Sequence, residues 1–222
     1  MGNLLSYSPP QEGVWLIYTN YPEKKISPFK YYVSKENQSL IPEFQKTLEH
    51  YLQIYETLFG PYLYSEFAVV ENTDETGYGM PGFTLLGQKV LQLPFLTYSS
   101  LPHELLHNWW GNGVFVDTAF GNWSESMTTY FSDQWIAESQ GQGPGYRRKS
   151  LQNYLTFKSQ GGDFPIKDFR ERHDNITQAV GYNKGLMVLK MLEFELSSNQ
   201  GVLENPRHKW IECAEKFYLK YQ

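Results

Sequence analysis

The spacing of hydrophobic residues differs between the two halves of the chain, and it predicts strands first and helices later. Short runs rich in aromatic and branched residues lie at 13–20 and 29–34, between turns that contain proline. Such runs are typical of β-strands. In the segment 41–60, by contrast, large apolar residues recur at steps of three and four, which predicts an amphipathic helix. Gly60 and Pro61 supply its C-terminal stop.

Two further strands are expected beyond this helix, at 66–72 and 83–93. The segment 73–82 between them contains three glycines and one proline. Because glycine and proline interrupt regular structure, we expect this segment to form an irregular turn.

The second half of the chain is expected to be mainly helical. Proline is well accepted in the first turn of a helix, so one helix should begin at Leu101-Pro102. Further helices are predicted at about 122–138, at about 175–197 and from Pro206 to the end, with a loop at 141–150. The apolar density between 186 and 196 predicts a buried helix. The last helix has no stop signal, which indicates either a fragment of a longer protein or a frayed end.

Composition narrows the class of protein. A chain of 222 residues with 41% hydrophobic residues can form one large domain, or one domain with two lobes. The net charge of −5 and the lack of a long lysine and arginine cluster argue against a nucleic-acid partner. No apolar run approaches the length of a membrane span. Cys213 is the only cysteine, so no internal disulfide is expected, and neither compartment nor oligomeric state is indicated.

The stretch HELLHNWWGN carries the clearest chemistry in the chain. A step of four residues places His103 and His107 on one face of a helix, where both imidazoles can bind the same metal ion. Zn²⁺ suits imidazole nitrogen, and it lowers the pKa of a bound water toward neutrality. Glu104 lies beside such an ion and can take a proton from that water as a general base. The pattern also occurs by chance on amphipathic helices, with both histidines merely at the surface.

A catalytic zinc site needs a third protein ligand and one open position. Glu125 fits this role because it lies near the start of the next predicted helix, in NWSESMTTYFSD. An acidic residue in the first turn also stabilises a helix through its dipole, and the two roles are compatible. We therefore expect one Zn²⁺ ion bound by His103, His107 and Glu125.

These motifs, in this order, resemble the aminopeptidase N-like family of zinc peptidases. The resemblance runs from about Tyr51 to the C-terminus and includes HELLHNWWGN, NWSESMTTYFSD and VGYNKGLMVLKML. It implies the gluzincin ligand set of two histidines and a distal glutamate, with Glu104 as general base. It also implies that the Tyr182 hydroxyl stabilises the oxyanion of the tetrahedral intermediate, which a phenol near zinc can do by donating a hydrogen bond. Without the family pattern, Tyr182 would be one more packed aromatic among 17 tyrosines.

The same resemblance implies a fold. We expect an α+β, thermolysin-like catalytic domain over residues 1–222, with a mixed β/α lobe at 1–100 and a mainly helical lobe at 101–222. The zinc should lie between the two lobes. The family's N-terminal β-sheet domain and C-terminal helical domain are expected to be absent from this chain.

Two departures from the family pattern concern the site. Seventeen residues separate His107 from Glu125, one fewer than usual, which a shorter connecting loop can absorb. The family's Gly-x-Met-Glu-Asn stretch, whose glutamate binds the substrate's free amino group, is replaced here by GYGMPG, without the Glu-Asn pair. The backbone of Tyr78, Gly79 and Met80 can still pair with an extended peptide substrate.

Three hypotheses for function follow. The first is zinc-dependent hydrolysis of peptide bonds, in the form of aminopeptidase-type removal of N-terminal residues. The second is an endopeptidase or a peptidase of unusual specificity, since the amine-binding acid is missing unless Glu71 or Glu75 replaces it. The third is a non-catalytic peptide-binding module that retains zinc, against which the intact base Glu104 and the open ligand position argue.

Overall fold

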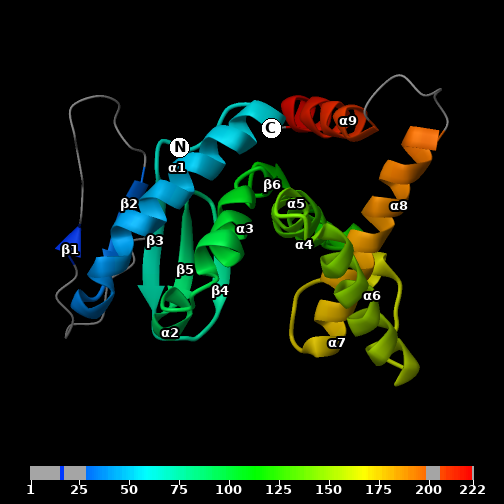
Figure 1. Cartoon of the computed structure of the whole chain (residues 1–222), viewed down its shortest axis with the longest axis horizontal. Coiled ribbons are helices and arrows are strands. Elements are labelled where there is room, and N and C mark those ends of the chain that lie inside the picture. Colours follow the sequence, from blue (N-terminus) through cyan, green and yellow to red (C-terminus); the bar gives the residue numbers. More distant parts are fainter. Residues whose placement is uncertain (1–15, 18–28, 199–205, 222) are drawn as a thin grey trace.

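The computed structural model describes residues 16–17, 29–198 and 206–221, which form an α+β structure (Figure 1). Its five-stranded sheet consists of β1 (Leu16–Ile17), β2 (Phe29–Val33), β3 (Phe67–Asn72), β4 (Gly77–Met80) and β5 (Phe83–Gly87). The strand order is β1-β2-β3-β5-β4; β2, β3 and β5 run parallel, and β1 and β4 are antiparallel to their neighbours. β4 is an edge strand, and α3 (Ser100–Leu106) packs against it.

The predicted strands at 29–34 and 66–72 are confirmed by β2 and β3. Of the predicted strand at 13–20, only β1 belongs to the described part of the chain. The prediction of an irregular turn at 73–82 is wrong for its second half, which forms β4. Gly77 and Gly79 indicated a turn in the sequence, but in the structure they allow this strand to approach α3 closely.

The predicted strand at 83–93 is correct only for β5. It ends at Gly87, and the short helix α2 (Gln88–Leu91) follows. Glu75 Oε2 accepts hydrogen bonds from the backbone N–H groups of Lys89 and Val90, at 2.9 and 3.3 Å. These bonds satisfy donors that the first turn of a helix leaves free, and no local pattern in 83–93 indicates them.

α1 (Ile41–Phe59) confirms the predicted amphipathic helix, and a short 3₁₀ helix, η1 (Lys35–Leu40), leads into it. Pro42 occupies its first turn, and Gly60 follows its last residue with φ of 102°, a backbone conformation that favours glycine. The buried side chains of the helix are Ile41, Phe44, Leu48, Tyr55 and Phe59. They form the apolar face that the spacing predicted, and the helix runs across the sheet (Figure 1).

The second half of the chain is mainly helical, as expected. η2 (Leu96–Tyr98) precedes α3, and a two-stranded sheet of β6 (Trp110–Gly111) and β7 (Val114–Phe115) follows it, then η3 (Thr118–Phe120). The predicted helix at 122–138 is a continuous run of α4 (Ser124–Thr128), the π-helical η4 (Thr129–Gln134) and α5 (Trp135–Ser139). After η5 (Ile166–Asp168), the predicted helix at 175–197 is α7 (Asn175–Gln178), the π-helical η6 (Ala179–Lys184) and α8 (Gly185–Ser198). α9 (Pro206–Tyr221) confirms the last helix.

The loop predicted at 141–150 is wrong, because α6 (Gly143–Ser159) begins inside it. Pro144 occupies the first turn of this helix, where proline starts a helix instead of breaking it. Only Gly141, with φ of 73°, acts as a stop, and it separates α5 from α6.

The expectation that the apolar part of α8 is buried is also wrong. Met191 and Phe194 are 63% and 67% exposed, whereas Leu186 is buried. Glu193 is buried too, and its carboxylate accepts hydrogen bonds from the Tyr130 hydroxyl and the Lys190 amine, both at 2.5 Å. A helix that is apolar on several sides does not reveal by its sequence which side the rest of the protein covers.

The centre of the molecule is an aromatic core around Trp109 and Trp110, both of which are fully buried. The rings that pack on them are those of Tyr55, Phe59, Tyr62, Trp123, Phe131 and Tyr218. Tyr218 comes from α9, which packs on both α1 and α8 (Figure 1). Among the described residues, no helix combines the length and the apolar character needed to cross a membrane.

Truncation of Phe59 tests how far the fold depends on this core. Its ring is fully buried, 5.3 Å from Trp110 and 4.9 Å from Phe131 between ring centroids. We expect Phe59→Ala to lower the free energy of unfolding by about 3–5 kcal/mol in a denaturant titration, because it leaves a cavity. Phe120→Ala is the matched control, since Phe120 is 77% exposed. Equal effects of the two substitutions would contradict this description of the core.

Candidate metal centre and active site

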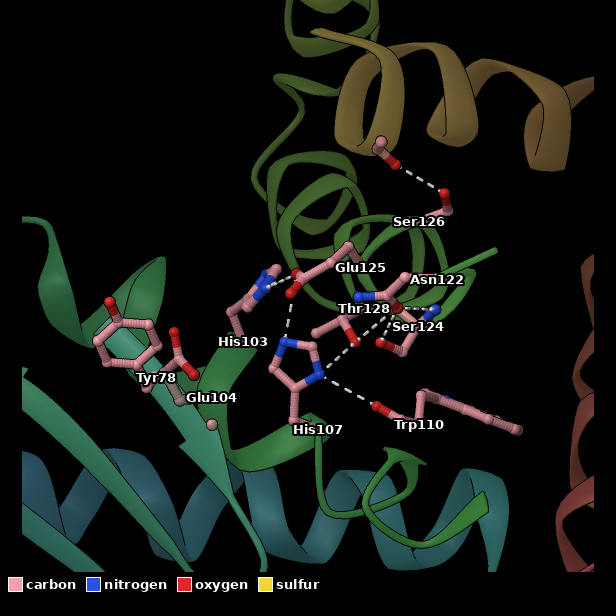
Figure 2. A network of polar contacts seen from close by, with 12 residues as sticks. Tyr78, His103, Glu104, His107, Trp110, Asn122, Ser124, Glu125, Ser126 and Thr128 are labelled. Atoms are coloured by element: carbon pink, nitrogen blue, oxygen red, sulfur yellow. Dashed lines mark hydrogen bonds and ion pairs between the residues drawn. The ribbon is translucent and has the colours of Figure 1, made fainter. Parts of the chain in front are cut away.

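Three side chains that the sequence predicts as metal ligands meet at one point between α3 and α4 (Figure 2). The four-residue step brings His103 and His107 to one side of α3, and Glu125 enters from the first turn of α4. One ligand atom from each residue lies within 4.8 Å of the other two. The Nε2 atoms of the two histidines are 3.4 and 3.3 Å from Glu125 Oε2.

The opposite ring nitrogens are held by hydrogen bonds that fix the tautomers. His107 Nδ1 lies 3.0 Å from the backbone carbonyl oxygen of Trp110, and His103 Nδ1 lies 3.1 Å from Asp133 Oδ2. A carbonyl and a carboxylate only accept hydrogen bonds, so both Nδ1 atoms carry the hydrogen. In a neutral imidazole, Nε2 then has a free lone pair, and in both residues it faces the Glu125 carboxylate.

This arrangement fits a zinc ion. Two lone pairs directed at a carboxylate oxygen repel one another unless a cation or protons lie between them. In a tetrahedral site with zinc–nitrogen distances of about 2.0–2.1 Å, ligand atoms are about 3.3–3.4 Å apart, which matches the separations of the two Nε2 atoms from Glu125 Oε2. The donor set of two imidazoles and one carboxylate also leaves a fourth position open.

The electrostatics of the cluster agree with this interpretation. Burial lowers the pKa of both imidazoles, but the carboxylates outweigh it: Asp133 and Glu125 hold the pKa of His103 well above its usual value, and Glu125 raises that of His107. Burial opposes ionisation of Glu125, yet His107 and His103 hold its pKa well below the usual range. The cluster therefore keeps an ionised carboxylate in a partly buried place and attracts positive charge to it.

Asp133 is a candidate site residue that the sequence did not indicate. It lies eight positions after Glu125, whereas two α-helical turns take about seven residues. The π-helical segment η4 between the two residues has wider turns, and so Asp133 also reaches the site, where it orients His103. An i+8 spacing alone would not have indicated this contact.

Glu104 lies beside the three ligands. Its Oε2 atom is buried and has no hydrogen-bond partner among the described residues. A Cβ atom at Gly79 would stand 2.8 Å from this oxygen and 2.9 Å from His107 Cβ, so β4 passes directly over both side chains. Burial raises the pKa of the Glu104 carboxyl, although the nearby histidines oppose this. A buried carboxyl with a raised pKa and a free oxygen is suited to accept and return a proton.

Tyr182 stands on the other side of the cluster, in η6. Its ring stacks on the imidazole of His103, with centroids 6.3 Å apart and planes at 11°, and meets the edge of Phe169. Burial and then the Glu125 carboxylate raise the pKa of the Tyr182 hydroxyl far above its usual value. The hydroxyl therefore stays protonated and can donate a hydrogen bond.

A close contact between helices brings Tyr182 to the cluster of His103, His107 and Glu125. Ser126 Oγ donates a 2.7 Å hydrogen bond to the carbonyl of Gly181 (Figure 2, where Ser126 is labelled). A Cβ atom at Gly185 would stand only 1.9 Å from Ser126 Oγ, so glycine is required there. This contact draws η6 against α4, the helix that carries Glu125.

The structure places the remaining candidates as follows. Tyr78 is 50% exposed, while Gly79 and Met80 are partly buried, and all three belong to β4 beside Glu104. Glu71 accepts hydrogen bonds from Ser34 N and Asn37 Nδ2, and Glu75 caps α2. Both acids therefore have other partners, and neither belongs to the group of His103, His107 and Glu125.

The chain matches no model of a known protein family, and no curated protein matches it. Solved structures do resemble it. Native yeast LTA4 hydrolase gives a TM-score of 0.65 at 18% identity, over 87% of this chain and 32% of that one. A variant of an M1 zinc metallopeptidase from Deinococcus radiodurans gives 0.60 at 21% identity, over 87% and 41% of the two chains. The variant of this enzyme bound to a Tyr-Ser-Ala substrate gives 0.57 at 19% identity, over 87% and 40%.

These likenesses establish the fold, a mixed helix and sheet fold shared with M1 zinc metallopeptidases. The chain spans between 32% and 41% of the length of the structures described. The expected α+β class agrees with them.

Substitution of Asp133 tests whether its hydrogen bond to His103 Nδ1 strengthens metal binding at the candidate site. Outer carboxylates that orient a metal-binding histidine typically contribute tenfold to a hundredfold in affinity. We expect Asp133→Asn to weaken zinc binding by about that factor in a chelator competition, because a neutral amide oxygen is a weaker acceptor for His103 Nδ1–H than the carboxylate. Asp168→Asn, at an exposed position, serves as control. Unchanged affinity in the Asp133 variant would show that the Asp133 carboxylate does not support the metal site.

Proposed function

We propose that the chain is the catalytic domain of a zinc-dependent peptidase. The observation that carries this proposal is a buried carboxyl with a free oxygen, Glu104, beside an open three-ligand site. A structural zinc site is usually closed by four protein ligands and needs no such group. The similarity of fold to M1 zinc metallopeptidases supports the same function.

The proposed mechanism assigns a separate task to each residue. His103, His107 and Glu125 would hold the zinc ion. A bound zinc ion supplies Lewis-acid catalysis and lowers the pKa of water. Glu104 takes a proton from the attacking water and later gives it to the leaving amine, which its raised pKa favours. Tyr182 donates a hydrogen bond to the carbonyl oxygen as negative charge develops on it.

An extended peptide is the proposed ligand of β4. An exposed sheet edge binds such a peptide through main-chain hydrogen bonds. The strand lies over Glu104 and His107, so a peptide along it would pass the metal site. We include Tyr78, Gly79 and Met80 in this binding surface.

We also propose that residues 1–222 form one thermolysin-like domain with two lobes. The contacts that support a division into two lobes are those around the proposed metal site. All the site residues belong to the mainly helical part: His103 and His107 come from α3 at its start, and Glu125 and Tyr182 come from its later helices. α3 in turn packs on β4 of the mixed part. The zinc would then lie where the two parts meet.

Glu104→Gln separates catalysis from zinc binding. The substitution keeps the shape of the side chain but removes its ability to accept a proton. We expect zinc content to stay the same and peptide turnover to fall at least about a hundredfold, the usual contribution of a general base. Full activity with bound zinc would contradict the mechanism, and loss of zinc would show that Glu104 supports the metal site instead.

Two forms of the proposed peptidase are possible: one that requires a free N-terminus on its substrate and one that does not. The resemblance favours aminopeptidase-type cleavage. The side-chain positions of β4 that face Glu104 are both glycine, however, so this strand offers no acid for an ammonium group, and Glu71 and Glu75 have other partners. This observation favours a peptidase that does not require a free amine.

Matched peptides with a free and an acetylated N-terminus distinguish the two forms. From the geometry of β4, we expect acetylation to change kcat/KM by less than about tenfold, a difference of under about 1.4 kcal/mol. A preference of more than about a hundredfold for the free amine would establish the aminopeptidase form. It would also require an acid other than Glu71 and Glu75 to bind the amine.

A further inference from the structure

The main-chain groups of β4 alternate between the sheet and its open edge. Gly87 N donates a 2.9 Å hydrogen bond to Thr76 O, which identifies this pair as hydrogen-bonded in the antiparallel ladder. Such pairs alternate, so Tyr78 and Met80 bond to β5. Gly77 and Gly79 therefore direct their N–H and C=O groups out of the sheet, where a peptide would pair with them.

One of these four outward groups is already occupied. Asn112 Nδ2 donates a 3.3 Å hydrogen bond to the carbonyl of Gly79. Gly77 N–H, Gly77 C=O and Gly79 N–H have no hydrogen-bond partner in the part of the chain that the structure describes. The Gly79 carbonyl points out of the edge, so the Asn112 amide already satisfies the acceptor that the N–H of a partner strand would use.

Asn112 is itself held firmly in place. Its backbone N–H donates a 3.0 Å hydrogen bond to the carbonyl of His107, and its own carbonyl accepts a 2.6 Å hydrogen bond from the Tyr64 hydroxyl. The residue therefore links the end of the helix with the proposed metal ligands to the edge strand. A second asparagine, Asn108, makes a similar link, because its Oδ1 accepts a 2.8 Å hydrogen bond from Gly82 N.

We propose that Asn112 is a positioning residue that determines which peptide bonds of a substrate need an amide hydrogen. A peptide along β4 finds three free main-chain groups instead of four. The substrate residue that would donate to Gly79 O gains nothing from its N–H, so proline or an N-methylated residue is accepted there. This inference rests on the proposed peptidase function and on substrate binding along β4.

The position concerned lies close to the chemistry. The space beside Gly79 is filled by Glu104 Oε2 and by the side chain of His107. A substrate residue opposite Gly79 is therefore next to the proposed base and one of the proposed ligands. The specificity that Asn112 sets would thus apply near the bond that is cleaved.

The test is a scan of single N-methylations along one peptide that the zinc-loaded full chain hydrolyses. In the wild-type protein, we expect one position near the cleaved bond to lose less than about threefold in kcat/KM. The position whose N–H donates to the Gly77 carbonyl should lose about tenfold, the effect of one hydrogen bond. In Asn112→Ala, the tolerant position should become sensitive by about fivefold to tenfold, while the other positions keep their values.

Controls separate this role from a general structural one. Asn153→Ala, on the exposed side of α6, should reproduce the wild-type profile. Asn112→Asp keeps the size of the side chain and lacks the amide donor. It should therefore show the same new sensitivity to N-methylation, and it replaces the alanine variant if that variant does not fold. If Asn112 only stabilised the fold, its substitution would reduce kcat/KM by the same factor for every peptide of the scan.

The outcomes distinguish the inference from the function on which it rests. Hydrolysis with no tolerant position, or with a profile that Asn112→Ala and Asn112→Asp leave unchanged, overturns the inference alone. No hydrolysis of the parent peptide by the zinc-loaded protein overturns the proposed function and the inference together.

Discussion

One electrostatic constraint shapes the site: the partly buried carboxylate of Glu125 faces Nε2 of both His103 and His107. Without an ion, protons on the imidazoles supply the positive charge beside this carboxylate, so the pKa values of both histidines are raised and the pKa of Glu125 is lowered. A divalent cation satisfies all three groups at once. The hydrogen bonds on the far side of each imidazole make sense for the same reason, because they fix the tautomer that exposes Nε2.

Two departures from regular helix geometry bring this site together. The wide turn of η4 places both Glu125 and Asp133 at the site, and the second π-helical segment, η6, carries Tyr182. Such segments cost stability in isolation and are frequent at functional sites. Here the tight contact between Ser126 and Gly185 secures η6 against α4, so the irregular helix is held by packing.

The sequence predicted what depends on local spacing and missed what depends on contacts between elements. The step from His103 to His107 specifies one helix face, and α1 follows from its apolar period, so both could be predicted. Asp133 could not, because its orientation depends on a π turn that has no known sequence pattern. The exposure of Met191 in α8 was missed for a related reason: apolar density does not identify the side that the core covers.

The glycines of β4 show how one residue type supports two opposite interpretations. In the sequence, Gly77 and Gly79 indicate a turn, because glycine frees the backbone. In the structure they belong to a strand, and their role is the lack of a side chain, since a Cβ would lie 3.1 Å from a Glu104 oxygen at Gly77 and 2.8 Å from one at Gly79. The wall of the site on this side is therefore main chain alone. A peptide bound at that wall can pair only with amide and carbonyl groups of β4. For this reason an asparagine that occupies one carbonyl changes which substrate position needs an amide hydrogen, an effect that a charged side chain would not have.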